Sequence, residues 1–386
     1  MQEPALIHWT EEGQPRVARW RSERGTPPPA NVVIADESLA ADDAYGDAAQ
    51  GVGLLWRGDF PLARQLLAAL THRIDRPRRK PKPHATAAER PRAELFNLER
   101  QARAQRARTL GMLLVPVDAD YRIPLPRAPD LREAFVETWG PPGGEASVVS
   151  LRELLGIVGA HEWRKKGIEL PGLGGRVHPH YGVFSPIRSE YVELVAKEPL
   201  PASIGPSSVA FDVGTGTGVL AAVLARRGIA RVVATDLDER ALACARDNVA
   251  RLGLAARIEV ARADLFPEGR AALVVCNPPW LPARPSSPLE HGIYDPSSRM
   301  LSGFLAGLPA HLEAGAEAWL ILSDLAEHLG LRSREQLLAL FESAGLKVLG
   351  RSDARPKHPR AADATGPLHQ ARRAEVTSLW RLAPKG

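Results

Sequence analysis

The chain has 386 residues, of which 44% are apolar and 25% are charged, so it is long enough for two domains and can fill their cores. Its two cysteines, Cys244 and Cys276, exclude a disulfide framework and suit a reducing compartment. No apolar run approaches the ~20 residues of a membrane helix, and residues 1–30 show no signal-peptide pattern. These features predict a cytoplasmic protein with no membrane partner.

The net charge of +5 is unevenly distributed. The stretch from Arg73 to Arg108 holds twelve Lys or Arg residues against four acids, and residues 76–83 are its densest part. A Lys or Arg that contacts a phosphate releases counterions, so such a stretch predicts contact with a nucleic acid. A solvated linker is the alternative interpretation.

The first part of the chain predicts a smaller mixed α+β domain, residues 1–140, for substrate recognition. Val52–Trp56 is a candidate strand, and leucines at helical spacing predict a helix from Phe60 to Leu70. Residues 76–93 are rich in Pro, Arg and Lys and predict a loop or linker. A basic helix is expected over Glu94–Leu110, and the Pro-Pro-Gly-Gly run 141–144 predicts the domain boundary.

Residues 141–386 predict a second domain in which strands and helices alternate. The predicted helices are Val148–Val158, Ser189–Lys197, Val219–Arg227, Glu239–Leu252, Ser298–Leu312 and Ser333–Ala344. The predicted strands are Val209–Val213, Arg231–Thr235, Arg257–Ala261, Ala272–Cys276, Ala318–Leu322, Leu346–Gly350 and Glu375–Leu382. Such alternation demands a parallel, doubly wound α/β sheet, and the last two strands predict an antiparallel pair at its edge.

A glycine-rich loop, Gly214-Thr215-Gly216-Thr217-Gly218, lies between a predicted strand and helix. Glycines there allow a tight turn and let the backbone approach a ligand. A dinucleotide fingerprint would place its third glycine at Val219, so that pattern fails. Acids follow the next two strands: Asp236, which can accept both ribose hydroxyls, and Asp264. Asp238 is expected to cap the following helix.

Asn277-Pro278-Pro279-Trp280 follows the apolar run Leu273–Cys276. A conjugated amino nitrogen is a poor nucleophile because its lone pair is delocalised. The Asn277 side-chain oxygen and the Pro278 carbonyl can each accept one N–H, which directs that lone pair outward, and consecutive prolines hold the carbonyl outside any helix. Trp280 offers a flat face for stacking, worth ~1–3 kcal/mol on a nucleobase.

In this order and spacing, the motifs around Asp212–Gly218 and Asn277–Trp280 resemble those of class I S-adenosyl-L-methionine-dependent methyltransferases of the Asn-Pro-Pro-aromatic group. The resemblance covers roughly residues 178–386. It implies a Rossmann-like seven-stranded sheet and S-adenosylmethionine as cofactor. It further implies that Asp212 reaches the amino group of the cofactor, Asp236 the ribose and Asp264 the adenine amino group, with Leu265 against the ring. The resemblance implies these cofactor-binding residues: Asp212, Gly214, Thr215, Gly216, Gly218, Asp236, Leu237, Asp264, Leu265 and Asn277. It implies these catalytic residues: Asn277, Pro278, Pro279 and Trp280.

The segment from Gly182 to Glu190 resembles the loop that precedes the first motif in release-factor glutamine and RNA methyltransferases, where it covers the cofactor. Phe184 and Arg188 are therefore candidates for cofactor or substrate contacts. His178 and His180 have no cysteine or acid partner at metal spacing, so we expect a loop or lid role and no metal. Cys276 is read as a small buried residue and not as a nucleophile.

The group that the chain resembles includes methyltransferases of RNA base amines and of protein glutamine. The first prediction is an RNA base N-methyltransferase acting on ribosomal RNA or tRNA, and the alternative is a protein glutamine methyltransferase. Basic stretches favour RNA: Arg73–Arg108, the helix with Arg100, Arg103, Arg106 and Arg108, and the late loop Arg351–Arg373. Acids and leucines on that helix weaken this argument. A small-molecule acceptor, and a protein that binds the cofactor without transferring a methyl group, are further alternatives. Tyr or Phe is commoner than Trp at the position of Trp280, so the acceptor class stays open.

Overall fold

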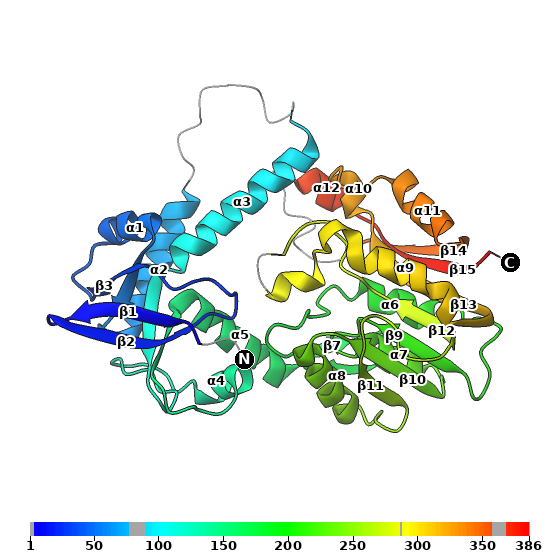
Figure 1. Cartoon of the computed structure of the whole chain (residues 1–386), viewed down its shortest axis with the longest axis horizontal. Coiled ribbons are helices and arrows are strands. Elements are labelled where there is room, and N and C mark those ends of the chain that lie inside the picture. Colours follow the sequence, from blue (N-terminus) through cyan, green and yellow to red (C-terminus); the bar gives the residue numbers. More distant parts are fainter. Residues whose placement is uncertain (1–3, 77–89, 286–287, 357–367, 386) are drawn as a thin grey trace. The chain divides into compact units, whose positions relative to one another are not determined.

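The computed structural model describes residues 4–76, 90–285, 288–356 and 368–385 and divides into two compact units (Figure 1). The first unit comprises residues 1–89 and 97–162, and the second comprises residues 90–96 and 163–386. The division therefore falls between Glu162 and Trp163, later than the expected boundary at residues 141–144. The reason is that a strand beyond that Pro-Gly run belongs to the sheet of the first unit.

The first unit is built on a six-stranded mixed sheet with the strand order β1-β2-β6-β5-β4-β3. β1 pairs antiparallel with β2, and β5 with β6, whereas the β2–β6, β3–β4 and β4–β5 pairs are parallel. Ile7, Trp20, Leu55, Leu114 and Val148 form one of its cores. Its strands are β1 (Leu6–Glu11), β2 (Gln14–Arg21), β3 (Asn31–Ala35), β4 (Val52–Trp56), β5 (Leu113–Val117) and β6 (Ser147–Ser150). Its helices are α1 (Ala41–Gln50), α2 (Phe60–Asp75), α4 (Arg132–Trp139) and most of α3 (Arg92–Leu110) and α5 (Leu151–Lys166).

The predicted strand Val52–Trp56 and the helix beginning at Phe60 are confirmed as β4 and α2. The predicted helix Val148–Val158 is wrong in its first part, because Val148 and Val149 lie in β6 and the helix begins at Leu151. All four residues of β6 are buried between β2 and β5. A short apolar run of this kind fits a strand or a helix equally well by periodicity, so only its neighbours decide. The densest basic segment, residues 77–83, lies outside the described residues.

The second unit contains a seven-stranded sheet with the strand order β11-β10-β9-β12-β13-β15-β14. All neighbours are parallel except at β15, which runs antiparallel to both β13 and β14. This confirms the doubly wound sheet and its antiparallel edge pair. Its strands are β9 (Val209–Val213), β10 (Arg231–Asp236), β11 (Ile258–Arg262), β12 (Ala271–Cys276), β13 (Leu312–Ser323), β14 (Leu346–Ala354) and β15 (Thr377–Pro384), beside a separate hairpin of β7 (Ile168–Leu170) and β8 (Gly175–Val177).

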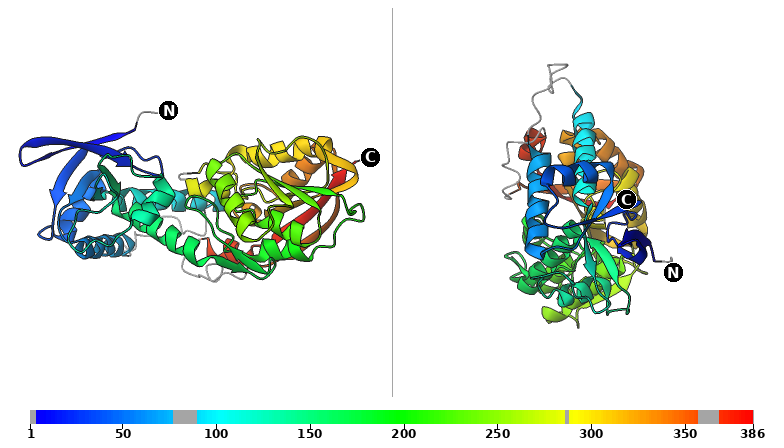
Figure 2. Two further views of the ribbon diagram at one scale, coloured as in Figure 1. Left: turned by 90° about the horizontal axis from the view of Figure 1, so that it is seen from below. Right: turned by 90° about the vertical axis from the view of Figure 1, so that its left-hand side faces the viewer.

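Helices cover both faces of this sheet (Figures 1 and 2). The helices α6 (Glu190–Lys197), α7 (Val219–Arg226) and α8 (Glu239–Arg251) pack on one face, and α9 (Arg299–His311) and α11 (Arg334–Ser343) pack on the other. Two short helices, α10 (Leu325–His328) and α12 (His369–Ala374), contact each other. Every residue of the central strand β12 is buried, as expected for a parallel strand covered on both faces.

The parallel strands β9, β10 and β12 are adjacent, so their carboxyl ends meet at one edge of the sheet. The segments that follow them are the glycine-rich loop, the Asp236–Asp238 turn and the Asn277–Trp280 corner. Ligands of open α/β sheets bind at such an edge. Across the described ranges, the structure contains no helix long and apolar enough to cross a membrane.

Candidate active site

The glycine-rich loop forms a tight turn between β9 and α7. Gly214, Gly216 and Gly218 have φ values of 73°, 55° and 80°, in the left-handed region that side chains disfavour. The N–H groups of Gly214 and Thr215 donate to the Thr235 carbonyl at 2.9 and 2.8 Å, which ties the loop to the end of β10. A Cβ on Gly214 would lie 2.6 Å from the terminal methyl group of Met300, which is the flexible end of its side chain, so this turn requires glycine mainly for its conformation.

Asp212 lies beneath the loop. Its side chain is 1% exposed, and Oδ2 accepts hydrogen bonds from the Thr215 hydroxyl at 2.6 Å and from the Ala221 N–H at 2.9 Å. Burial raises the pKa of this carboxyl to about 6. These contacts hold the loop onto the first turn of α7. Asp212 therefore positions Thr215, which lines the pocket described below.

Asp236, at the end of β10, accepts from the Gly216 N–H through Oδ2 and from the Asp238 N–H through Oδ1, both at 3.0 Å. Burial raises the pKa of its carboxyl. Asp238 caps α8 by accepting from the Arg240 N–H, as predicted. The Asp236 carboxylate thus lies against the glycine-rich loop at the place where the sequence predicted the ribose.

Asp264 and Leu265 follow β11. The Asp264 side chain is exposed, and its nearest cation is Arg299 at 3.7 Å. Leu265 has a φ of 74°, and its carbonyl accepts from the Thr235 hydroxyl at 2.5 Å. A bulky residue in this region is strained, and such strain persists only where the surroundings hold it.

The Asn277–Trp280 corner follows β12 directly. The Asn277 side-chain oxygen Oδ1 accepts a hydrogen bond of 2.9 Å from the indole nitrogen Nε1 of Trp280. Trp280 is partly buried and packs against the cores on both faces of the sheet. The Pro278 carbonyl accepts no hydrogen bond from any described residue. Cys276 is fully buried, and burial raises the pKa of its thiol far above the usual range, as suits a packing residue.

The loop before β9 is held on helix α8. The His178 N–H donates to Asn248 Oδ1 at 2.7 Å, and the His180 ring lies 3.1 Å from the Asp247 carboxylate. Asn248 also donates to the Thr217 carbonyl at 3.0 Å, which links this loop to the glycine-rich loop. Among the described residues there is no cluster of His, Cys, Asp and Glu that could hold a metal ion.

One pocket joins the two predicted motifs. Six predicted site residues line it: Gly214, Thr215, Gly216, Asp236, Asn277 and Pro279. Asp212, Gly218, Leu237, Asp264, Leu265, Pro278 and Trp280 are outside its lining. Gly182, Val183 and Phe184 line it from the preceding loop, whereas Arg188 lies with its guanidinium carbon 5.1 Å from the centre of the Trp280 ring.

The sequence did not predict several lining residues, namely Tyr191, Thr217, Val219, Leu220, Ala241, His291, Gly292 and Met300. His291 and Gly292 come from a segment without a strand or helix pattern, so no signal placed them. Gly292 lies against Phe184, because a Cβ there would be 2.7 Å from the Phe184 Cβ. The same pocket therefore has walls from five separate parts of the second unit, within residues 182–191, 214–220, 236–241, 277–279 and 291–300.

Residues 199–278 match the model of the ribosomal protein L11 methyltransferase (PrmA) family. The chain is 35% identical over 156 residues to the release factor glutamine methyltransferase of Cereibacter sphaeroides, which covers 36% of this chain and 53% of that protein. It is 46% identical over 76 residues to the ribosomal protein L11 methyltransferase of Pelotomaculum thermopropionicum, covering 19% and 25%. Among solved structures, the ribosomal protein L11 methylase of Lactobacillus delbrueckii subsp. bulgaricus is 18% identical with a TM-score of 0.34, covering 48% of this chain and 73% of that chain.

The sheet, the glycine-rich loop, and the matches to the family model and to the curated relatives define the second unit as a class I, Rossmann-like methyltransferase domain with S-adenosylmethionine as its cofactor. The pocket fits that cofactor, since it combines a glycine-rich backbone turn with a carboxylate. Within that class, the domain is similar to methyltransferases named for release factors and ribosomal protein L11. The chain spans about half the length of the release factor enzyme named above.

Proposed function

We propose that the second unit transfers a methyl group from S-adenosylmethionine to a planar primary amino group. One observation carries this proposal: Asn277 and the glycine-rich loop line the same pocket. A donor held on the loop and an amine held by Asn277 would therefore meet in one cavity. Aligning two reactants in this way contributes ~7–11 kcal/mol to lowering a barrier.

The protein's part in this reaction is to orient the amine. Bound S-adenosylmethionine supplies an electrophilic methyl group on a sulfonium, and the S–C bond breaks as the N–C bond forms. Asn277 Oδ1 has a second lone pair beside the one used by Trp280, and it accepts one N–H of the amine. The Pro278 carbonyl accepts the other. The methylated nitrogen is acidic and releases its proton to water, so no strong base is required.

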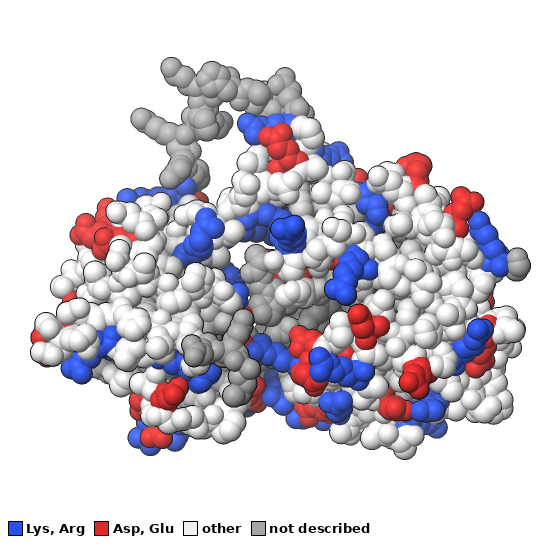
Figure 3. Space-filling model, viewed as in Figure 1, with Lys and Arg blue, Asp and Glu red and all other residues white. Residues whose placement is uncertain are grey.

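For the acceptor we place the side-chain amide of a protein glutamine first. Such an amide is planar and carries two N–H donors, as the Asn277 and Pro278 oxygens require. The relative from Cereibacter sphaeroides is named for a glutamine acceptor, and the chain is 35% identical to it over 156 residues. Three arginines of α3 also have partners within the first unit: Arg103 pairs with Glu99, Arg108 with Gln105, and Arg106 with Asp75 at 2.8 and 2.9 Å. In Figure 3, basic and acidic side chains are interspersed over the visible face.

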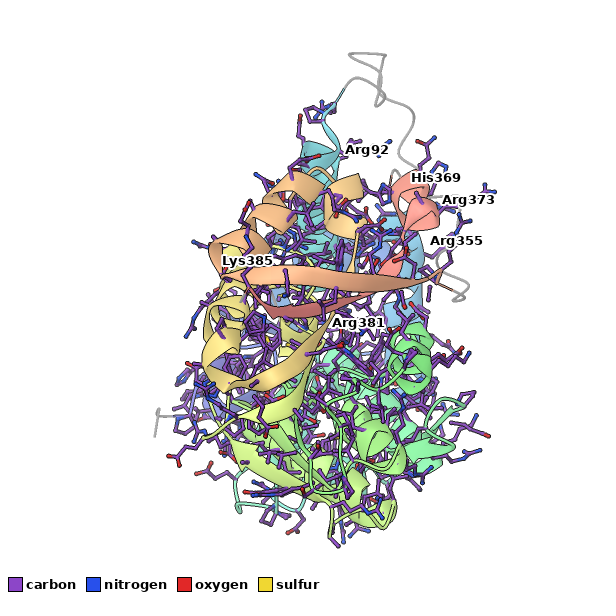
Figure 4. The ribbon with its side chains drawn as sticks, turned by 90° about the vertical axis from the view of Figure 1, so that its right-hand side faces the viewer. Arg92, Arg355, His369, Arg373, Arg381 and Lys385 are labelled. Carbon is purple, nitrogen blue, oxygen red and sulfur yellow. The ribbon has the colours of Figure 1, made fainter. Side chains whose placement is uncertain are left out.

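An RNA base amine, the first prediction from sequence, is the second candidate. It is favoured by the basic side chains Arg92, Arg355, His369 and Arg373 of the second unit, which project outward in Figure 4. The start of α3 and the residues of α12 share one apolar cluster through Phe96 and Ala371, so Arg92 and Arg373 border a common surface. Lys357, His358 and Arg360 of the same predicted loop lie outside the described residues.

The test uses purified protein with tritiated S-adenosylmethionine and three substrates: total RNA, ribosomal proteins, and release factors. Asn277→Ala protein serves as the matched control. Label that survives ribonuclease and is lost to protease supports the glutamine acceptor, and amino acid analysis then identifies methylglutamine. The opposite sensitivity supports the RNA base. Wild-type protein that binds the cofactor but labels neither class of macromolecule would contradict both acceptors.

A further inference from the structure

The hydrogen bond between Trp280 and Asn277 selects one of two orientations of a carboxamide. The oxygen and nitrogen ends of an asparagine side chain have nearly the same shape, but one accepts hydrogen bonds and the other donates them. An indole N–H donates only, so at 2.9 Å it is compatible with the oxygen of Asn277 and not with its NH₂ group. If the carboxamide were flipped, two donors would face each other.

The indole ring is held in turn by Arg188. The guanidinium carbon lies 5.1 Å from the centre of the Trp280 ring, within the range of a cation–π interaction. The same ring packs against the apolar clusters on both faces of the sheet. Arg188 belongs to the segment that begins at Gly182 and lines the cofactor pocket through Phe184, so one short stretch of chain contacts both the pocket and the acceptor corner.

Two buried carboxylates fix the position of Arg188. Its Nε donates to Glu190 at 3.0 Å, and its terminal nitrogen lies 2.9 Å from Glu375. Ser323, at the end of β13, donates to Glu375 at 2.6 Å. Glu190 and Glu375 are 4% and 3% exposed. A buried carboxylate that loses its cation is strongly destabilised, so this arrangement holds the guanidinium over the indole ring.

We propose that Trp280 and Arg188 are positioning residues for methyl transfer, which rests on the proposed function of this site. The Trp280 N–H locks Asn277 with its oxygen toward the pocket, and Arg188 locks the indole that makes this bond. The remaining lone pair of Asn277 then faces an incoming N–H, so the site selects acceptors that carry a hydrogen-bond donor on the reacting nitrogen. Phenylalanine at position 280 has no donor and leaves the carboxamide able to flip.

The bond itself is tested in the full chain labelled with ¹⁵N-tryptophan. The eight tryptophans give eight indole N–H resonances, and the one missing in Trp280→Phe belongs to Trp280. We expect this resonance to move in Asn277→Ala and in Arg188→Gln. Arg351→Gln is the matched control, because Arg351 also lies over a tryptophan, Trp380 at 5.1 Å, and pairs with a carboxylate, Asp353 at 2.9 Å. It should leave the Trp280 resonance in place.

The positioning role is tested by kinetics. We expect Trp280→Phe to lower kcat about tenfold, the size of one lost hydrogen bond, with little change in the affinity for S-adenosylmethionine. Arg188→Gln should also lower kcat. Arg188→Lys should lower kcat less, since lysine keeps the charge near the ring and near Glu375. Retained cofactor affinity shows that each variant is folded.

Two results would overturn the proposal. One is a Trp280 resonance that does not respond to Asn277→Ala, which means that the bond does not form. The other is a wild-type kcat both in Trp280→Phe and in an Arg188→Gln protein whose Trp280 resonance has moved, which leaves the bond a packing contact. If the wild type transfers no methyl group, the proposed function fails, and this positioning role fails with it whatever the resonance shows.

Discussion

Oδ2 of Asp236 accepts a hydrogen bond of 3.0 Å from the N–H of Gly216. The carboxylate at the end of β10 therefore supports the glycine-rich loop that follows the neighbouring strand, β9. Both residues line the same pocket. The two sequence features predicted separately for the cofactor therefore form one structure. A change at Asp236 is expected to act on the loop and on the ligand together.

Asp236→Ala is expected to weaken binding of S-adenosylmethionine by about 1.5–3 kcal/mol, the range for hydrogen bonds to a charged group. Isothermal calorimetry measures this change directly. Asp236→Asn, which keeps an oxygen for Gly216, should lose less. Equal affinities in wild type and Asp236→Ala would show that the ribose does not bind at this carboxylate.

Asn277→Ala is expected to reduce turnover by several orders of magnitude and to leave cofactor affinity nearly intact, because the oxygen that orients the amine is removed while the loop is unchanged. Single-turnover labelling and calorimetry on the same sample give the two quantities. An active Asn277→Ala protein would remove the basis for assigning the acceptor to this corner.

Asp212→Asn should change how stability depends on pH. The folded-state pKa of Asp212 is about 6, above its usual value of 3.8. The folded protein thus holds a proton that the unfolded chain has released, and this stabilisation is present at low pH and is lost as the pH rises through 6. An uncharged asparagine keeps an oxygen for Thr215 and Ala221 without this loss.

The free energy of unfolding of Asp212→Asn, relative to wild type, should therefore rise with pH, by up to about 3 kcal/mol for a shift of this size. Urea unfolding between pH 4.5 and pH 8 measures the difference. A difference that falls as the pH rises would contradict the assigned direction.

Gly292→Ala is expected to lower the free energy of unfolding by about 1–3 kcal/mol, the usual cost of forcing an extra carbon into a packed contact, and to weaken cofactor binding. The new Cβ would meet Phe184 at 2.7 Å, and both residues line the pocket. Adding Phe184→Gly, which removes the Cβ that the new carbon meets, should recover part of the stability lost in the single variant. Gly159→Ala, where no heavy atom lies within 4 Å of the added carbon, is the control and should bind the cofactor normally.

Much of the second unit was predictable from short stretches of sequence. The seven strands of its main sheet were all anticipated, because Val209–Val213 is mostly apolar, Ala271–Cys276 is wholly apolar, and the helices between the strands have regular spacing. The β7–β8 hairpin was not anticipated. The loop Gly214–Gly218 and the corner Asn277–Trp280 were predictable as motifs, because each consists of consecutive residues. The first unit was less predictable from sequence. Val148 and Val149 form a strand because they pair with β2 and β5, which lie far away in the sequence.

By itself, the sequence determined the order of the elements, the class of the second domain and its cofactor, since periodicity, turn residues and motif spacing are local properties of the chain. Only the tertiary structure decided which side chains line the pocket and which support it. The Asp212 carboxylate is buried beneath the loop, where it accepts hydrogen bonds from Thr215 of the loop and Ala221 of α7. Arg188 came to hold Trp280 because a carboxylate far along the chain, Glu375, is buried beside it. Burial and hydrogen-bond direction depend on groups that meet only when the sheet is assembled, and no local pattern records them.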